Sequence, residues 1–225
     1  MTLGRPRLHL RETGSTNDRA RELAAAGAPH GTLVTAGAQT AGRGRQGRVW
    51  SAPPGHALLM SLVLREVHPL LPLAAAVGVA GAVGKDAQIK WPNDVLVGGR
   101  KVAGILAEGR PQDAWAVLGI GVNVAIRIDD LPPELHATAA TLGREPAEVE
   151  PFLASLLASL ERVLALAADE LLDAWRARDA LFGREITWSA GHGRAAGIDG
   201  EGRLVVELQD GGRTTLDAGE VHLDR

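Results

Sequence analysis

The chain has 225 residues, of which 45% are hydrophobic and 23% are charged, and these are the proportions of an ordinary globular protein. Its formal net charge is −3, so no global positive field recruits nucleic acid or anionic lipid, and any anion site must be local. The absence of cysteine excludes disulfides, thiol catalysis and cysteine-based metal sites.

The histidines and the apolar runs exclude further classes. No two of the seven histidines are four residues apart, so a zinc site on one helix face is not expected. The first residues lack the apolar stretch of a signal peptide, and the longest apolar run, residues 70–83, is too short to span a bilayer. We therefore expect a cytoplasmic protein.

The first half of the chain alternates helix and strand signals. A cap cluster at residues 15–18, strong helix formers and Gly27 predict a helix over about 16–26. The β-forming and apolar patterns that follow predict strands at 32–38 and 57–65 and a helix at 70–84.

The second half predicts strands first, then a helical segment, and then short strands again. Four strand-like runs occupy 88–91, 94–97, 100–108 and 115–125, and Gly98-Gly99 predicts a hairpin turn. Apolar residues at helical spacing predict one long or broken helical segment over 146–181. After Gly183 the pattern becomes short strands at 185–189, 193–198, 203–208 and 213–216, which is typical of a small barrel that packs on the main domain.

Residues 42–50 read Gly-Arg-Gly-Arg-Gln-Gly-Arg-Val-Trp, and we call this segment the arginine loop. Its glycines let the backbone approach a ligand, while its guanidinium groups suit an anion. The spacing matches a dinucleotide-binding fingerprint, but Pro53-Pro54 prevents the helix that this fingerprint requires. Two phenylalanines, no tyrosine and the acidic balance disfavour a nucleic-acid patch. A solvated surface loop is the remaining alternative.

A second motif, Lys90-Trp91-Pro92-Asn93-Asp94, lies about forty residues further on. Its terminal aspartate can hold a magnesium ion or orient a cationic group, although a capped turn before a hairpin is the simpler interpretation of Asn-Asp alone. Lysine is scarce, since all but three of the 24 basic residues are arginine, and the three lysines, Lys85, Lys90 and Lys101, all lie in or close to this motif. A lysine in such a chain can mark a need for a compact ammonium group.

With both motifs in this order, the chain resembles the biotin protein ligases, also called biotin–[acetyl-CoA-carboxylase] ligases. The resemblance runs from about residue 10 to the C-terminus. The stretches that carry it are Ser15-Thr16-Asn17, Gln39 to Trp50, Lys90 to Asp94, Lys101 to Leu106 and Gly119-Ile120-Gly121-Val122-Asn123.

The resemblance implies an α/β (α+β) fold in which a mixed sheet is flanked by helices, as in class II aminoacyl-tRNA synthetases. It implies a catalytic domain over 1–182 and a small SH3-like barrel over 183–225. Family members that also repress transcription carry an N-terminal winged helix-turn-helix, and the motifs begin here at Ser15, so we expect none in this chain.

The activity implied is ATP-dependent formation of biotinyl-5′-AMP, with magnesium, followed by transfer of biotin to a lysine of a biotin carboxyl carrier protein. We expect no DNA or membrane partner, and a homodimer is open. Two alternatives stay open: a lipoate-type acyl-protein ligase on the same fold, and a non-catalytic module that binds biotin or a nucleotide.

Family position also assigns the candidate site residues. The catalytic set is Lys101, Arg43, Arg45 and Asp94, and Asp94 is the candidate metal ligand. The biotin set is Ser15, Thr16, Asn17, Gln39, Arg43, Gly44, Arg45, Lys101 and Gly104. The nucleotide set is Arg45, Arg48, Trp50, Lys90, Asn93 and Asn123.

Overall fold

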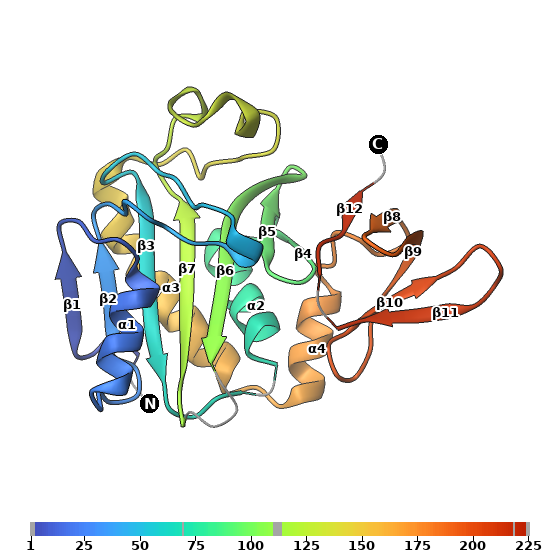
Figure 1. Cartoon of the computed structure of the whole chain (residues 1–225), viewed down its shortest axis with the longest axis horizontal. Helices are drawn as coiled ribbons and strands as arrows, with labels where there is room; N and C mark the ends of the chain where they lie inside the picture. Colours follow the sequence, from blue (N-terminus) through green and yellow to red (C-terminus); the bar gives the residue numbers. More distant parts are fainter. Residues whose placement is uncertain (1–2, 69, 110–113, 218, 224–225) are drawn as a thin grey trace.

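A computed structural model describes residues 3–68, 70–109, 114–217 and 219–223 of the chain (Figure 1). The larger unit contains β1 (Arg7–Leu10), α1 (Thr16–Ala25), β2 (Leu33–Ala36), β3 (Ala57–Leu64), α2 (Leu71–Val83), β4 (Gln88–Lys90), β5 (Asp94–Val97), β6 (Arg100–Gly109), β7 (Ala116–Asn123), α3 (Val149–Leu164) and α4 (Ala168–Arg176). The smaller unit contains β8 (Glu185–Trp188), β9 (Gly191–Ile198), β10 (Leu204–Glu207), β11 (Arg213–Leu216) and β12 (His222–Leu223). Short 3-10 turns lie at η1 (Arg45–Gly47), η2 (Ile128–Asp130), η3 (Pro133–Leu135) and η4 (Pro146–Glu148).

The larger unit is built on a seven-stranded sheet in the order β1-β2-β3-β7-β6-β5-β4, in which β1 and β2 are parallel and the other neighbours are antiparallel. The smaller unit is an antiparallel five-stranded sheet in the order β11-β10-β9-β8-β12. A mixed sheet with helices and a small antiparallel C-terminal unit confirms the predicted fold class.

The main elements lie where the sequence predicts them, with two differences. Of the two alternatives for 146–181, the structure has the broken one, with α3 and α4 separated at Ala165–Ala167. The short edge strands β1 and β12 were not predicted, because a few half-exposed residues carry too weak an alternation. The strand expected over 115–125 ends at Asn123, where the chain turns away into the segment that carries η2 and η3.

The two faces of the central sheet differ because side chains alternate along each strand. On β7, Leu118, Ile120 and Val122 point into the main core, where α2 and α3 cover the sheet. Helix α1 covers only part of the opposite face, through Ala20 and Ala24. The rest of that face, over β3, β7 and β6, is left for the arginine loop, which crosses it in front of β6 and β7 (Figure 1).

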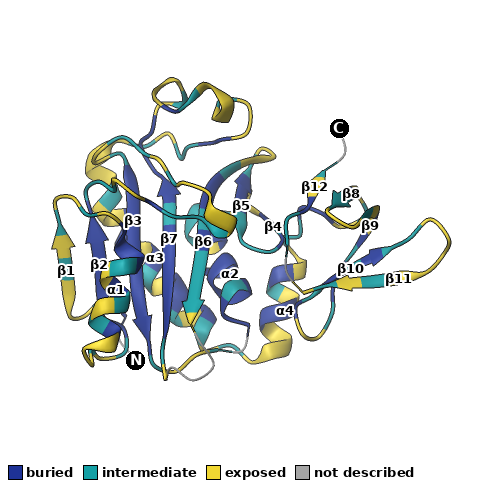
Figure 2. Ribbon diagram, in the orientation of Figure 1, coloured by how far each residue is buried: buried dark blue, intermediate teal, exposed yellow. Residues whose placement is uncertain are grey.

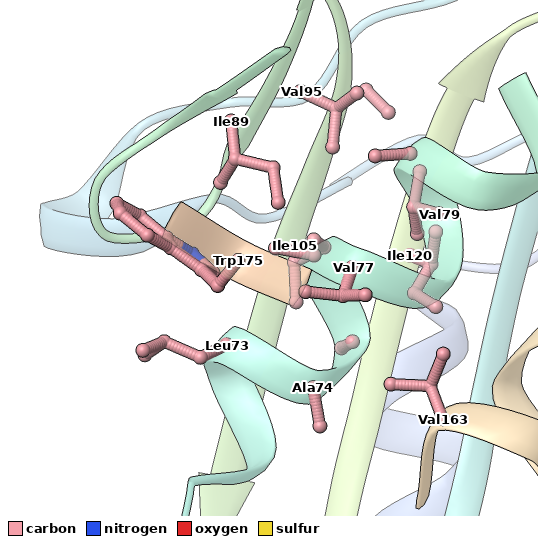
Figure 3. Close-up of a cluster of buried hydrophobic side chains, with 14 of the residues drawn as sticks. Leu73, Ala74, Val77, Val79, Ile89, Val95, Ile105, Ile120, Val163 and Trp175 are labelled. Carbon is pink, nitrogen blue, oxygen red and sulfur yellow. The ribbon is translucent and has the colours of Figure 1, made fainter. Parts of the chain in front are cut away.

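Helix α2 is apolar on nearly every side, as expected of a helix enclosed by other elements. It packs against β6, α3 and α4, and Figure 2 shows most of it buried, the exception being its last turn. Figure 3 shows Leu73, Ala74 and Val77 of α2 beside Ile105 and Ile120 of the sheet and Trp175 of α4. No helix within the described ranges is long and apolar enough to cross a membrane.

The C-terminal sheet shares the core of the larger unit. Ile186, Ile198 and Leu204 belong to the same buried cluster as α2, and Gly202 lies against Leu73. Trp91 is only 2% exposed, and its indole Nε1 donates a hydrogen bond to the Gly202 carbonyl oxygen at 3.1 Å. This contact ties the second motif directly to the C-terminal sheet.

We expect Trp91→Phe to lower the free energy of unfolding by about 1–3 kcal/mol, because it leaves the buried Gly202 carbonyl without its donor. Urea denaturation followed by circular dichroism measures this change. The control is Trp115→Phe, since Trp115 is half-buried beside α1. Equal urea midpoints for the two variants would show that the Trp91–Gly202 hydrogen bond does not stabilise the fold.

Candidate functional site

A cavity of about 770 Å³ opens on the part of the sheet that α1 leaves uncovered. Its lining comes from the start of α1, the arginine loop, strands β5 to β7, the segment 131–139 and the C-terminal unit. Every residue that the sequence assigns to the site lines this one cavity: Ser15, Thr16, Asn17, Gln39, Arg43, Gly44, Arg45, Arg48, Trp50, Lys90, Asn93, Asp94, Lys101, Gly104 and Asn123.

The floor of the cavity is made of glycines. Gly104 of β6 and Gly121 of β7 are register partners, and the Trp50 indole lies across both. A Cβ atom on Gly121 would come within 2.6 Å of the indole, and one on Gly104 within 2.9 Å. Only glycine at these two positions therefore leaves room for the indole of Trp50, a member of the predicted nucleotide set.

One end of the cavity is a polar pocket at the N-terminus of α1. Gln39 Oε1 accepts hydrogen bonds from the Thr16 backbone nitrogen at 2.7 Å and from the Thr16 hydroxyl at 2.9 Å. The buried Ser61 hydroxyl lies 2.8 Å from Thr16 Oγ1 and 2.6 Å from Asn17 Oδ1. A fixed set of hydroxyl and amide groups provides both donors and acceptors, which a cyclic urea requires.

The arginine loop brings three guanidinium groups over the cavity. Arg43 Nη2 lies 2.9 Å from Asp18 and 3.0 Å from Glu108, and Arg45 Nη1 donates to Asn93 Oδ1 at 3.4 Å. Just after Arg45 the loop turns at Gln46, whose φ of 54° is in the left-handed region. Such a conformation is unusual for a residue other than glycine and occurs at ligand-binding turns.

Arg48 instead contacts Glu220 of the C-terminal unit. Burial acts to raise the pKa of Glu220, but Arg48, together with His222 and Lys90, holds that pKa below its ordinary value. The C-terminal unit thus contributes to the cavity wall, through Glu220 and also through Arg184, Val221 and His222.

Lys101 lies at the centre of the cavity, beside Asp94. Its Nζ is 2.6 Å from Asp94 Oδ1, and because the approach is outside hydrogen-bond geometry the contact is an ion pair. The same ammonium group is 5.7 Å from the centroid of the Trp50 ring. The Lys101 backbone is fixed on both sides, since its nitrogen donates to the Thr138 carbonyl and its carbonyl accepts from Ala140.

Asn93, Asn123 and Lys90 complete the predicted set. Asn93 Nδ2 donates to the Ile105 carbonyl at 2.8 Å, and Asn123 Nδ2 donates to the Ala140 carbonyl at 2.9 Å, so both amides brace the cavity wall. Burial lowers the pKa of Lys90, while the nearby carboxylates of Asp94 and Glu220 oppose that shift.

The charge balance of the cavity is opposite to that of the whole chain. Among the described lining residues six are basic and two are acidic, whereas the chain carries a net charge of −3. The basic ones are Arg43, Arg45, Arg48, Lys90, Lys101 and Arg184, and the acidic ones are Asp94 and Glu220. This cationic site can hold two anions together and screen the repulsion between them.

Sequence reasoning missed several residues of the site. Asp18, Ser61 and Glu108 hold the predicted residues in place, and each is far from its partners in sequence or has no distinctive motif. The lining residues Leu131, Leu135 and Ala139 come from a segment without predicted structure. Only the strand register could have found Ser61, which pairs with Gly119 across β3 and β7.

The comparisons with known proteins agree with this geometry. Residues 10–124 match the Biotin/lipoate A/B protein ligase family, and residues 182–224 match the biotin protein ligase C-terminal domain. The chain is 36% identical over 220 residues to the bifunctional ligase/repressor BirA of Bacillus spizizenii, covering 88% of this chain and 68% of that protein. It is 36% identical over 238 residues to the biotin–[acetyl-CoA-carboxylase] ligase of Paracoccus denitrificans, covering 94% and 98%.

A solved structure of the biotin protein ligase from Aquifex aeolicus in complex with biotin and ATP superposes on this chain with a TM-score of 0.83. The two sequences are 28% identical, and the match covers 98% of this chain and 99% of that one. These matches confirm the resemblance inferred from the motifs, and this chain belongs to the biotin protein ligase family.

Proposed function

We propose that this chain activates biotin with ATP as biotinyl-5′-AMP and transfers the biotinyl group to a lysine of a biotin carboxyl carrier protein. The observation that carries the proposal is that one cavity joins a neutral polar pocket to a cluster of cations. Biotin offers the matching groups, a ureido ring at one end and a carboxylate at the other. ATP supplies the second anion.

In the first step the biotin carboxylate attacks the α-phosphorus of ATP. A carboxylate–phosphorus bond forms, the bond from the α-phosphorus to the bridging oxygen breaks, and pyrophosphate leaves. Thr16, Asn17 and Gln39 hold the ureido ring, so that the carboxylate points toward Lys101 and the arginine loop. Lys101 and Arg45 face the developing charge, and preformed positive charge of this kind stabilises such transition states.

In the second step the neutral amine of the carrier lysine attacks the acyl carbon of the adenylate. The acyl–oxygen bond breaks, AMP leaves with the electron pair, and the amine loses a proton. The mixed anhydride is prone to hydrolysis, so the site has to exclude water until the carrier arrives. The arginine loop, which lies across the open face of the sheet, is the segment that would provide this cover.

Magnesium fits the cavity as an ion carried by the triphosphate. Over the described part of the chain, no group of three or more His, Cys, Asp or Glu side chains is placed to hold a metal. Asp94 is the carboxylate beside Lys101, and together with phosphate oxygens it would hold the ion, which is how Mg²⁺ usually binds nucleotides in proteins. The bound ion would neutralise phosphate charge.

The match of residues 182–224 to a biotin protein ligase domain favours biotin over lipoate as the acyl substrate. The same match supports the predicted division into domains 1–182 and 183–225. The site roles, the cytoplasmic location, the possible homodimer and the absence of a DNA partner stay predictions.

Lys101→Ala should slow biotin-dependent pyrophosphate release at least about 100-fold, because it removes the ammonium group that faces both reacting anions. A coupled pyrophosphate assay with ATP, Mg²⁺ and biotin measures the rate. Lys85→Ala is the matched control, since Lys85 is exposed and does not line the cavity. An active Lys101→Ala variant, or an equal loss in the control, would refute this role.

Gly121→Ala should raise the KM for ATP by about tenfold, because the added methyl group displaces the Trp50 indole and strained packing costs about 1–3 kcal/mol. The control is Gly200→Ala, where a Cβ atom meets open space. Steady-state kinetics with biotin saturating measure the effect. An unchanged KM for ATP would show that Trp50 does not form part of the nucleotide site.

A further inference from the structure

Glu108, near the end of β6, connects the two halves of the site although it does not line the cavity. Strand alternation places it on the same face of β6 as Gly104 and Leu106. Its carboxylate accepts a hydrogen bond from Asn17 Nδ2 at 2.6 Å and another from Arg43 Nη2 at 3.0 Å. One carboxylate therefore contacts both the polar pocket and the arginine loop.

The Asn17 side chain is held in place by contacts on several sides. Its Oδ1 lies 2.6 Å from the Ser61 hydroxyl, and its Nδ2 also approaches the Leu106 carbonyl at 3.4 Å. A Cβ atom on Gly119 would lie 2.1 Å from Asn17 Oδ1, so the amide packs directly on the β7 backbone. The shorter of the two Nδ2 contacts is the one to Glu108, and it is charge-assisted.

Arg43 is held from one side only. Both of its acidic contacts, to Glu108 and to Asp18, are made by Nη2. Its Nε is buried and has no hydrogen-bond partner among the residues that the structure describes. Buried donors normally have an acceptor, and Arg43 lines the cavity, so this N–H is a donor left over for an anionic ligand. The fork geometry of a guanidinium makes its orientation decisive for such a contact.

We propose that Glu108 is a positioning residue for biotin activation, which fixes the Asn17 amide and the Arg43 guanidinium relative to each other. The proposal rests on the proposed function, in which Asn17 holds the ureido ring and the biotin carboxylate points toward the arginine loop that carries Arg43. Glu108 touches neither substrate. It holds Asn17 toward the ureido pocket and turns the Nε edge of Arg43 toward the carboxylate, so its loss affects biotin binding before it affects chemistry.

Glu108→Gln keeps the shape of the side chain and removes its charge. We expect the KM for biotin to rise about tenfold, which is the scale of one charge-assisted hydrogen bond. The KM for ATP and kcat with both substrates saturating should each change by less than about threefold. The control is Glu22→Gln, an exposed acid on α1 that pairs with Arg19; this variant should behave as the parent protein does.

Calorimetry with biotin alone tests whether Glu108 acts through Arg43. Glu108→Gln should weaken biotin binding clearly less in an Arg43→Gln background than in the parent protein, because only its contact with Asn17 is left to lose there. If Glu108→Gln fails to fold, Glu108→Asp retains the charge, is too short to reach both partners, and should still raise the KM for biotin.

An unchanged or lowered KM for biotin would overturn the proposal, and a lowered value would mean that Glu108 competes with the substrate for Arg43. Equal effects in both backgrounds, or parallel losses in kcat and in the KM for ATP, would also overturn it. These outcomes differ from failure of the proposed function, in which the parent protein itself releases no pyrophosphate with biotin.

Discussion

The site depends on the absence of side chains at one place in the sheet. Gly104 and Gly121 are paired across β6 and β7, on the part of the sheet face that α1 leaves uncovered, so the sheet is open there while its other face is packed with aliphatic residues. The Trp50 indole fills part of this space, and its packing on the two glycines holds the end of the arginine loop against the sheet. Strand alternation places Ser61 and Gly119, which pair across β3 and β7, beside Asn17. The register shift between β5 and β6, at Lys101–Ala103, brings the Lys101 side chain to the face of Gly104.

Electrostatics divide the cavity into two parts. The cations lie on the arginine loop, at the end of β4, at the start of β6 and, as Arg184, in the C-terminal unit, and the uncharged hydrogen-bonding groups lie at the start of α1. Three of the cations already have acidic partners: Asp18 and Glu108 for Arg43, Glu220 for Arg48, and Asp94 for Lys101. Partners of this kind make a dense positive cluster tolerable in the empty protein and set the direction of each cation. The Arg48–Glu220 ion pair and the Trp91–Gly202 hydrogen bond connect the arginine loop and the second motif to the C-terminal unit.

The sequence carries most of the fold and the chemically distinctive part of the site. Apolar periodicity and glycine turns were enough to predict α1, α2, β3 and β6 close to their observed bounds, and the arginine loop and the second motif lie in one cavity as expected. The sequence left undecided whether the helical segment breaks before α4, since Leu166 and Ala167 carry no helix-breaking signal. Asp18, Ser61 and Glu108 could not be predicted, because their importance comes from contacts across the sheet rather than from local pattern.

The central claim is that this cavity joins biotin to AMP. The most direct measurement is mass spectrometry of the small molecules bound to the protein after mixing with ATP and Mg²⁺, with biotin and lipoate present at equal concentration and no carrier protein. The account predicts that biotinyl-5′-AMP accumulates, about one per protein chain, with little lipoyl-5′-AMP. Detection of lipoyl-5′-AMP in its place would contradict the assignment of the acyl substrate, and detection of unmodified biotin and ATP alone would contradict the assignment of an adenylating enzyme.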